Sequence, residues 1–540
     1  MNPDADNTSG TDGARGPGRR TIAATLAVVV VLIVAAVVLV VAGDDGDGKS
    51  GTTAKLAAPP QPQGFASRPD LQPPPVKVLE STAAQAPGYV FTAPKKVPNG
   101  GGDDGLMIYD RNGDLVWFDA NGTLPNGKDQ SRMNFNVQRY RGKPVLTWWE
   151  GEAKRGFGEG EGVIADTNYR EIARIQPKGP LKADFHEFHL TDRGTALMLA
   201  YHERKEPEDL RKAGGTKDDL LMENTVLEID IKTGKTLFRW DASDHVDPLD
   251  SYHPVPKRED LAYDFFHGNS VDLDENGDFI VSARSLHAVY NIDRETKKIN
   301  WQLNGRKSDF KMGDGAAFRW QHDALAMPDG TLTVLDNHAF SAKEKEEKGA
   351  ESRGIVLKLD EKKGTATLVQ EYRRPGGALG PTQANMQTLP NGNRMVGWGG
   401  ETPRLTEFTA AGEVALDARF ERTPTESYRA YKQRWVGRPT DDPAIASRRS
   451  GSGTAVRASW NGATEVATWR VVGGDTATDL KPLGDAPKKG FDSLVLVQGQ
   501  PKWIAAEALN AKGKVLGRSK AVQPGSTEYV TSRKGASKQR

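Results

Sequence analysis

Histidine, asparagine and arginine side chains recur at matching places in five stretches of this chain. The stretches are residues 134–149, 186–201, 269–284, 322–337 and 384–399, and each begins eight positions before a turn glycine and ends seven positions after it. Their first residues are Asn134, His186, Asn269, His322 and Ala384, and their last residues are Trp149, Tyr201, Arg284, Asn337 and Gly399. If each turn is a two-residue β-hairpin, the first and last residues face each other across two antiparallel strands. The pattern therefore predicts one rim that gathers polar side chains from several hairpins, which is the layout of an active site.

The residue types at this rim suit an anion. Four histidines lie near equivalent hairpin ends, namely His186, His267, His322 and His338, and Arg284 joins them. Arginine, asparagine and protonated imidazole bind oxyanions such as sulfate or phosphate. A neutral histidine beside them can be a nucleophile, because its ordinary pKa of about 6.5 leaves it mostly uncharged at neutral pH. A nearby arginine lowers that pKa further.

A metal ion is the competing interpretation of the same histidines. Several histidines can converge on zinc or iron, and Glu187 and Asp323 neighbour two of them in the chain. Strand alternation points these carboxylates away from the faces of His186 and His322, and an arginine disfavours a bound cation. No serine occupies a matching position, so no Ser-His-Asp arrangement is indicated. We therefore expect neither a metal nor a cofactor.

A second recurring unit lies between the hairpins and identifies the fold. It reads apolar-x-apolar-Asp, a turn, and a strand that often holds Trp, and it occurs six times, for example in residues 107–118, 226–240 and 289–301. Two hairpin-like units per repeat, six times over, predict an all-β chain with a six-bladed β-propeller over residues 76–440. The ring is expected to close with N-terminal strands near residues 76–79 and 88–92. A pair of β-sandwiches or an irregular all-β fold is the alternative.

The repeat ends before residue 450, and the pattern changes. Residues 454–460, 467–473, 492–497, 503–509 and 515–521 alternate as short strands. They predict a small β-sandwich over residues 450–525, followed by a disordered basic tail over 526–540.

The N-terminal part predicts a membrane anchor. Residues 21–42 contain no charge and consist almost entirely of Val, Ala, Leu and Ile, a length that at about 1.5 Å per residue spans a bilayer core. A cleaved signal peptide usually has a shorter apolar run. We expect a disordered cytoplasmic tail (1–20), one transmembrane helix (21–43) and a Pro/Gly-rich linker (44–75). Arginines before the segment and aspartates after it predict a cell-membrane protein with its catalytic domain outside the cytoplasm.

Composition limits the partners and the chemistry. The chain has 540 residues and a net charge of +1, so nothing favours nucleic acid as a partner. It has no cysteine, which excludes disulfides, thiolate metal sites and cysteine nucleophiles. The oligomeric state is left open.

Several motifs, taken in order, resemble the arylsulfotransferase family. They are Phe185-His186-Glu187-Phe188, Phe266-His267-Gly268-Asn269-Ser270, Ser282-Ala283-Arg284 and Trp320-Gln321-His322-Asp323, with an opening similar at residues 87–91 and 106–110. The resemblance covers about residues 75–435 and implies a six-bladed propeller. It also implies sulfuryl transfer from an aryl sulfate to a phenol, without a nucleotide donor, through a sulfated histidine.

The resemblance implies a role for each matching residue. His322 corresponds to the nucleophile. His267, Asn269 and Arg284 correspond to residues that hold the sulfuryl oxygens, and His186 corresponds to an acid/base for the phenol oxygen. Tyr201 and Trp149 are expected to stack on aromatic substrates. Two other functions remain open at this point: a non-catalytic binding propeller at the cell surface, and a metal-dependent lyase or hydrolase.

Overall fold

The computed structural model describes residues 64–96, 103–154, 156–205, 210–215, 220–256, 261–339, 349–400, 404–421 and 425–532. The predicted tail 1–20, anchor 21–43 and the first part of the linker lie outside these residues. Within the described part of the chain, no helix has both the length and the apolar character that a membrane span requires.

Six sheets, antiparallel apart from one short parallel pair, occupy the region between Val76 and Gln433. In sheet order they are β26 (Thr425–Gln433), β2 (Tyr89–Lys96), β3 (Gly105–Tyr109), β4 (Leu115–Ala120); β5 (Ser131–Tyr140), β6 (Lys143–Ala153), β7 (Gly158–Ala165), β8 (Glu171–Ile175); β9 (Phe188–Leu190), β10 (Thr195–Lys205), β11 (Leu220–Asp230), β12 (Thr236–Asp241); β13 (Gly268–Leu273), β14 (Phe279–Ala283), β15 (Ala288–Ile292), β16 (Ile299–Leu303); β18 (His322–Ala326), β19 (Thr331–Asp336), β20 (Arg353–Asp360), β21 (Thr365–Arg373), β17 (Lys311–Met312); and β22 (Asn385–Thr388), β23 (Arg394–Gly397), β24 (Arg404–Phe408), β25 (Val414–Phe420), β1 (Val76–Ser81). Short 3₁₀ turns are η1 (Leu210–Ala213), η2 (Ala242–Asp244), η3 (Pro248–Asp250) and η4 (Arg284–Leu286).

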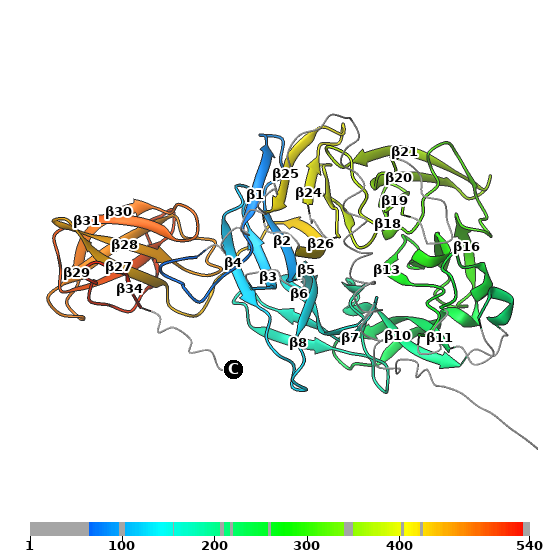
Figure 1. Ribbon diagram of the computed structural model, residues 1–540, viewed down its shortest axis with the longest axis horizontal. Helices are drawn as coiled ribbons and strands as arrows, with labels where there is room; N and C mark the ends of the chain where they lie inside the picture. The colour runs from blue at the N-terminus through cyan, green and yellow to red at the C-terminus, as the bar shows by residue number, and fades with distance from the viewer. Residues whose placement is uncertain are drawn as a thin grey trace, which may run out of the picture. The chain divides into compact units, whose positions relative to one another are not determined.

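The six sheets follow one another around a common centre (Figure 1). β26 contacts β5, β5 contacts β9, β10 contacts β13, β13 contacts β18, β18 contacts β22, and β22 contacts β26 again. Because β9 pairs with β10, these contacts link the six sheets in a closed circuit.

The middle strands of each sheet are buried on both faces, which explains their composition. β14 and β15 have the sequences FIVSA and AVYNI, and every residue of both is buried. The sheet that contains them packs against its neighbour through Phe238 and Phe279, whose rings stack at 4.0 Å. Continuous apolar runs of this kind belong to sheets that are covered on both sides.

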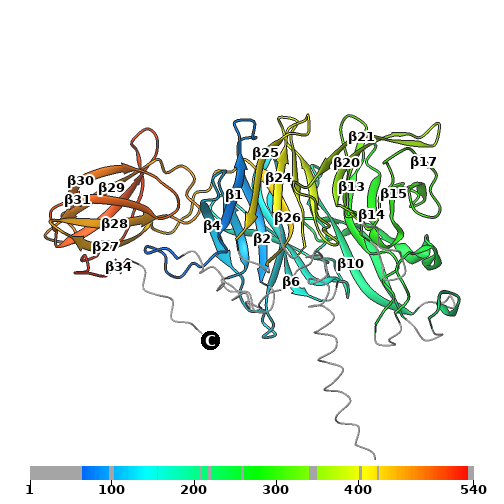
Figure 2. The same ribbon diagram turned by 45° about the horizontal axis from the view of Figure 1, so that its top comes forward.

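The N-terminal strands close the ring of sheets, as predicted, but β1 and β2 join two different sheets. β2 pairs with β26 from the C-terminal side of the region, whereas β1 adds an outer strand to the sheet of β25, as Figure 2 also shows. Strands from both ends of the region therefore tie the circuit together.

The prediction of two-residue turns is right for one hairpin and wrong for four. Tyr140 pairs with Lys143 across Arg141-Gly142, as predicted. In the other four, the loop holds three residues: Gly277, for example, has φ 87°, and Asp274 accepts its N–H at 3.0 Å. A three-residue loop ending in a left-handed glycine shifts the register by one residue. In β18 a bulge between His322 and Leu325 shifts the register by one residue more, so His322 pairs with Leu335 in place of Asn337.

Two further four-stranded sheets follow β26. One has the order β31 (Ser493–Gln498), β28 (Gly453–Ser459), β27 (Ala444–Ser450), β34 (Val530–Thr531), and the other has β30 (Lys481–Pro487), β29 (Thr468–Gly474), β32 (Trp503–Leu509), β33 (Val515–Arg518). A core that includes Ile445, Val456, Trp469, Val471 and Ile504 joins them, as in a sandwich. β34 falls within the predicted disordered tail, where it pairs with β27.

Candidate active site

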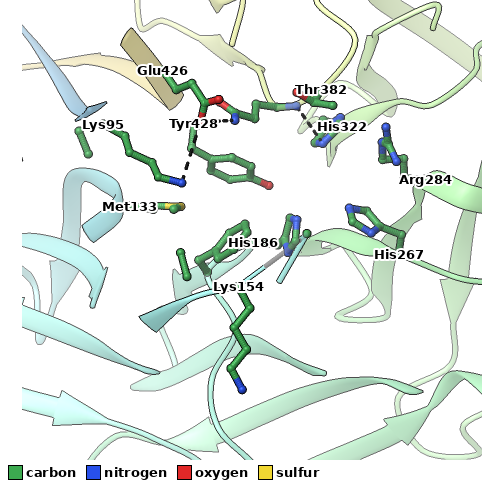
Figure 3. Close-up of a pocket in the computed structure, with 15 residues that line it drawn as sticks. Lys95, Met133, Lys154, His186, His267, Arg284, His322, Thr382, Glu426 and Tyr428 are labelled. Atoms are coloured by element: carbon green, nitrogen blue, oxygen red, sulfur yellow. Dashed lines mark hydrogen bonds and ion pairs between the residues drawn. The ribbon is translucent and has the colours of Figure 1, made fainter. Parts of the chain in front are cut away.

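The four residues predicted as catalytic line one pocket of about 300 Å³ at the converging ends of the inner strands. His186 precedes β9, His267 precedes β13, Arg284 follows β14 in η4, and His322 begins β18. Figure 3 shows their side chains gathered on one side of the pocket. Three successive sheets therefore supply the cluster, as the repeat of the hairpins predicted.

His322 is held in a single tautomer by an asparagine. Its Nδ1 lies 2.7 Å from Oδ1 of Asn337, and Nδ2 of Asn337 donates to the carbonyls of Gly380 (2.6 Å) and Gln383 (3.0 Å). Because the amide nitrogen is committed to these carbonyls, the amide oxygen faces the imidazole and Nδ1 carries the proton. The lone pair of Nε2 is left toward the pocket, where it accepts the Gln383 N–H at 3.2 Å.

The surroundings also keep His322 uncharged. Burial and the nearby Arg284 guanidinium lower the pKa of His322 well below its ordinary value, and the Asn337 hydrogen bond opposes this only in part. A buried neutral imidazole whose Nε2 is engaged only by one long hydrogen bond, from the Gln383 N–H, can act as a nucleophile when that bond breaks.

The other two histidines are oriented by carboxylates. Nδ1 of His186 lies 2.5 Å from Asp184, which also accepts the backbone N–H groups of Gly158 (2.6 Å) and His186 (2.8 Å). Nδ1 of His267 is hydrogen-bonded to Asp264. The two imidazole rings lie 5.0 Å apart, and both residues line the pocket. Aspartate–histidine pairs of this kind suit proton transfer.

The pKa values of His267 and Asp264 are both lowered, for different reasons. Burial lowers the pKa of His267, and Asp264 offsets this only partly. Burial raises the pKa of Asp264, but the His267 charge and hydrogen bond outweigh it, so the pKa of Asp264 is lowered overall. Asp264 therefore stays ionised beside His267.

Arg284 presents an uncompensated charge to the pocket. Its guanidinium stacks on Trp320 at 4.6 Å, and its Nη2 makes a long contact of 3.5 Å with the carbonyl of Pro381. Among the described residues its Nε has no hydrogen-bond partner, and no carboxylate forms an ion pair with it. Burial lowers the pKa of Arg284 from its ordinary value. A partly buried cation with an unused donor is suited to an oxyanion.

Tyr428, on the closing strand β26, completes the ring of donors. Its ring centroid lies 5.6 Å from that of His186 and 6.4 Å from that of His322, and its hydroxyl points toward the histidines (Figure 3). Within the described ranges this buried hydroxyl has no hydrogen-bond partner. Burial raises the pKa of Tyr428 well above 10, so the group remains a donor.

Three residues predicted to bind substrate lie behind the pocket wall. Asn269 is fully buried, and its Nδ2 donates to the carbonyl of Gln321 at 2.7 Å. Tyr201 stacks on His186 at 5.5 Å and donates to the carbonyl of Gly268 at 2.6 Å. Trp149 donates to the carbonyl of Ala183 at 2.9 Å. In this structure the three residues support the lining residues.

The described residues contain no group of three or more His, Cys, Asp or Glu side chains placed to hold a metal ion.

Asp184, Asp264 and Tyr428 are the site residues that sequence reasoning missed. The two aspartates could have been found, since each precedes its histidine by only two or three positions.

The fold and the site together define an all-β protein with a pocket, lined by three histidines and an arginine, at the centre of a circuit of sheets. The family model described as Arylsulfotransferase (ASST) matches residues 136–421, which are 286 of the 540 residues. The chain belongs to the arylsulfotransferase family. Membership supports aryl sulfate transfer as the general activity.

Other comparisons are more distant. No curated protein matches the chain. A protein of unknown function from Bacteroides caccae is 12% identical, with 64% of this chain and 98% of that chain covered and a TM-score of 0.36. Virginiamycin B lyase from Staphylococcus aureus is 9% identical (65% and 98% covered, TM-score 0.28), and a protein from Lactobacillus plantarum is 11% identical (76% and 99% covered, TM-score 0.33).

Proposed function

We propose that this protein transfers a sulfuryl group from an aryl sulfate to a phenol through a sulfated His322, without a nucleotide donor. The observation that carries the proposal is the neutral His322 imidazole, whose Nε2 lies in the same pocket as Arg284, a cation without an ion-pair partner among the described residues. The Nε2 lone pair attacks once the Gln383 N–H, 3.2 Å away, releases it. The six sheets are proposed to be the blades of a six-bladed propeller with this pocket at its axis.

The first half of the reaction sulfates the enzyme. The Nε2 lone pair of His322 attacks sulfur, and the sulfur–nitrogen bond forms as the bond to the aryl oxygen breaks. Protonated His186, oriented by Asp184, gives its proton to the departing phenolate. Arg284 lies where it can bind the charged sulfuryl oxygens. His267 can join it only as the imidazolium, because its Nδ1 faces Asp264 and a neutral ring would then have no proton on Nε2.

The second half reverses these steps with a new acceptor. A phenol gives its proton to the now neutral His186 and attacks sulfur, and the sulfur–nitrogen bond breaks to release neutral His322. Ala93, Met133, Ala153 and Phe185 line the pocket and offer an apolar surface for the aromatic rings. The enzyme returns to its starting protonation state.

The same proposal includes the location of the enzyme. The anchor predicted at residues 21–43 would hold the enzyme at the cell membrane as a single-pass protein with the catalytic domain outside the cytoplasm.

Turnover and a trapped intermediate test the function. The purified protein is incubated with a chromogenic aryl sulfate, with and without a phenol. We expect phenol-dependent release of the chromophore and, without the phenol, the mass of one SO₃ group on the peptide that contains His322. A protein that binds aryl sulfates without turnover or label would instead be a binding propeller.

Tyr428→Phe should lower kcat by roughly tenfold to a hundredfold, because a hydrogen bond to a charged group contributes about 1.5–3 kcal/mol. Tyr109→Phe is the matched control, since Tyr109 also buries a hydroxyl that has no partner among the described residues and does not line this pocket. Steady-state kinetics of both variants measure the difference. Equal kcat values would show that the Tyr428 hydroxyl takes no part.

Asn337→Asp should move the acid limb of the kcat/KM profile to higher pH. A carboxylate at Nδ1 stabilises the imidazolium, so it raises the pKa of His322, which burial and Arg284 now lower. At a given acidic pH, less His322 is then neutral and able to attack. Asn385→Asp, at a second buried amide that contacts the neighbouring sheet, controls for stability. An unchanged acid limb would contradict the assigned tautomer.

A further inference from the structure

Arg429 lies beneath the active site, on the side away from the pocket. It follows Tyr428 on β26 and is 4% exposed. Its Nη1 lies 3.2 Å from Glu187, its Nη2 lies 3.5 Å from Asp323, and Nη2 also donates to the carbonyl of Asn269 at 2.9 Å. From β26 the guanidinium therefore contacts three other segments, namely the residue before β9, β13 and β18.

Each of these partners is next to, or close to, an active-site histidine. Glu187 directly follows His186, Asn269 lies two positions after His267, and Asp323 directly follows His322. Glu187 and Asp323 direct their carboxylates to Arg429 while the adjacent histidines line the pocket, as alternation of neighbouring side chains allows. Asn269 contributes its backbone carbonyl in place of a side chain. One side chain thus contacts the three segments that carry the three histidines.

The backbone at these segments is one that needs support. His267 has φ 50° and Asp323 has φ 55°, a region that residues with a Cβ rarely adopt, and the pairing of β18 is interrupted between His322 and Leu325. Such bulges redirect side chains next to active sites and persist only where the surroundings hold them. Asp323 is held from two directions, by Arg429 and by the Met386 N–H at 2.8 Å.

We propose that Arg429 is a positioning residue that holds His186, His267 and His322 in register with one another through Glu187, Asn269 and Asp323. Its effect on turnover rests on the sulfuryl transfer proposed above, whereas its effect on the geometry of the histidines does not. A lysine cannot reproduce the contacts, because an ammonium is a point charge whereas the planar guanidinium fork reaches several acceptors at fixed angles.

The charges around Arg429 agree with this role. Burial raises the pKa of Asp323 to about 6, and Arg429 opposes the rise while Glu187 and Asp272 add to it. The groups that act on His322 from across the pocket are Arg284, His267 and His186. Without Arg429, Glu187 and Asp323 would remain as two buried carboxylates of like charge, and their strands would lose a common partner.

Single-partner variants give the sharpest test. Diethyl pyrocarbonate modifies neutral imidazole nitrogens, and peptide mass spectrometry gives the modification rate at each histidine. Asp323→Asn should change the modification rate at His322 by about threefold or more and leave the rate at His186 near its native value. Glu187→Gln should change the rate at His186 by a similar factor and leave the rate at His322 near its native value. Arg429→Lys should change the rates at all three histidines. It should also lower kcat by about tenfold or more with little change in KM.

Glu407→Gln is the matched control. Glu407 is a fully buried carboxylate that pairs with Lys432, also on β26, at 2.6 Å, and neither residue contacts the histidine segments. The modification rates of each variant are compared with those of Glu407→Gln at temperatures equally far below the Tm of each protein. Modification rates in Asp323→Asn and Glu187→Gln that match Glu407→Gln at every histidine would overturn the proposal, even if Arg429→Lys fails to fold. Because modification needs no turnover, the outcome also stands if the native protein transfers no sulfuryl group.

Discussion

Replacing His322 by alanine should lower sulfuryl transfer by about a thousandfold or more and abolish labelling of the protein by an aryl sulfate. The remaining cation, Arg284, can still bind the sulfate ester, so KM should change far less than kcat. Nδ1 of His322 faces the amide oxygen of Asn337, whereas Nδ1 of His186 and Nδ1 of His267 face carboxylates. Stopped-flow or steady-state release of the chromophore, together with intact-protein mass, measures both effects.

The control for this variant is His189→Ala. His189 lies on β9 and lines a separate cavity, on the side of the strands where Glu187 and Asp323 point. It should retain native turnover and labelling. If His322→Ala still became labelled, the peptide that carries the SO₃ group would identify His186 or His267 as the nucleophile in its place.

The positions of the inner strands could be predicted from the sequence, because the turn glycines and the residues around them repeat. The register could not, because Asp-Gly and Asn-Gly occur both in two-residue turns and at the end of three-residue loops. Of the five inner hairpins, the one at Arg141-Gly142 has the shorter loop. The strand β26 also escaped prediction, since it lacks the repeated frame and its place is set by pairing with β2, more than 300 residues away.

Position along the strand separates the site residues that line the pocket from those that do not. His186, His267, Arg284 and His322 lie at strand ends or in η4, where the chain leaves the sheet and the side chain can reach the centre. Asn269, Tyr201 and Trp149 lie within strands or beside a bulge, and their polar atoms satisfy backbone carbonyls of neighbouring segments. Buried polar groups must find partners, and sequence spacing does not reveal which ones.

Tyr428 shows the limit of repeat-based reasoning most directly. It enters the pocket from β26, which belongs to no repeated hairpin, so no internal comparison could place it. The aspartates that orient His186 and His267 are different, because Asp184 and Asp264 are close in sequence and follow a local pattern. Local hydrogen bonds were therefore predictable in principle, whereas contacts that depend on closing the circuit were not.

Arg284→Met should lower kcat/KM by roughly a hundredfold to a thousandfold, the loss typical of removing one charged donor from a developing oxyanion. The stacked guanidinium has unused donors and no ion-pair partner among the described residues, so its charge is available to the sulfuryl group. A second effect follows from His322. Arg284 lowers the pKa of His322, so its removal raises that pKa, and the acid limb of the pH–rate profile should move upward.

The two effects of Arg284 can be separated by pH and by a matched control. Above the acid limb His322 is neutral in both proteins, so the loss that remains there measures oxyanion binding alone. Arg306→Met removes another stacked arginine, 4.7 Å from Tyr252, outside the pocket, and should leave kcat/KM unchanged. Arg284→Lys should recover only part of the loss, because an ammonium keeps the charge that acts on His322 but lacks the planar fork. A lysine variant with full activity and a native pH profile would mean that charge alone, without bidentate hydrogen bonding, stabilises the transferred group.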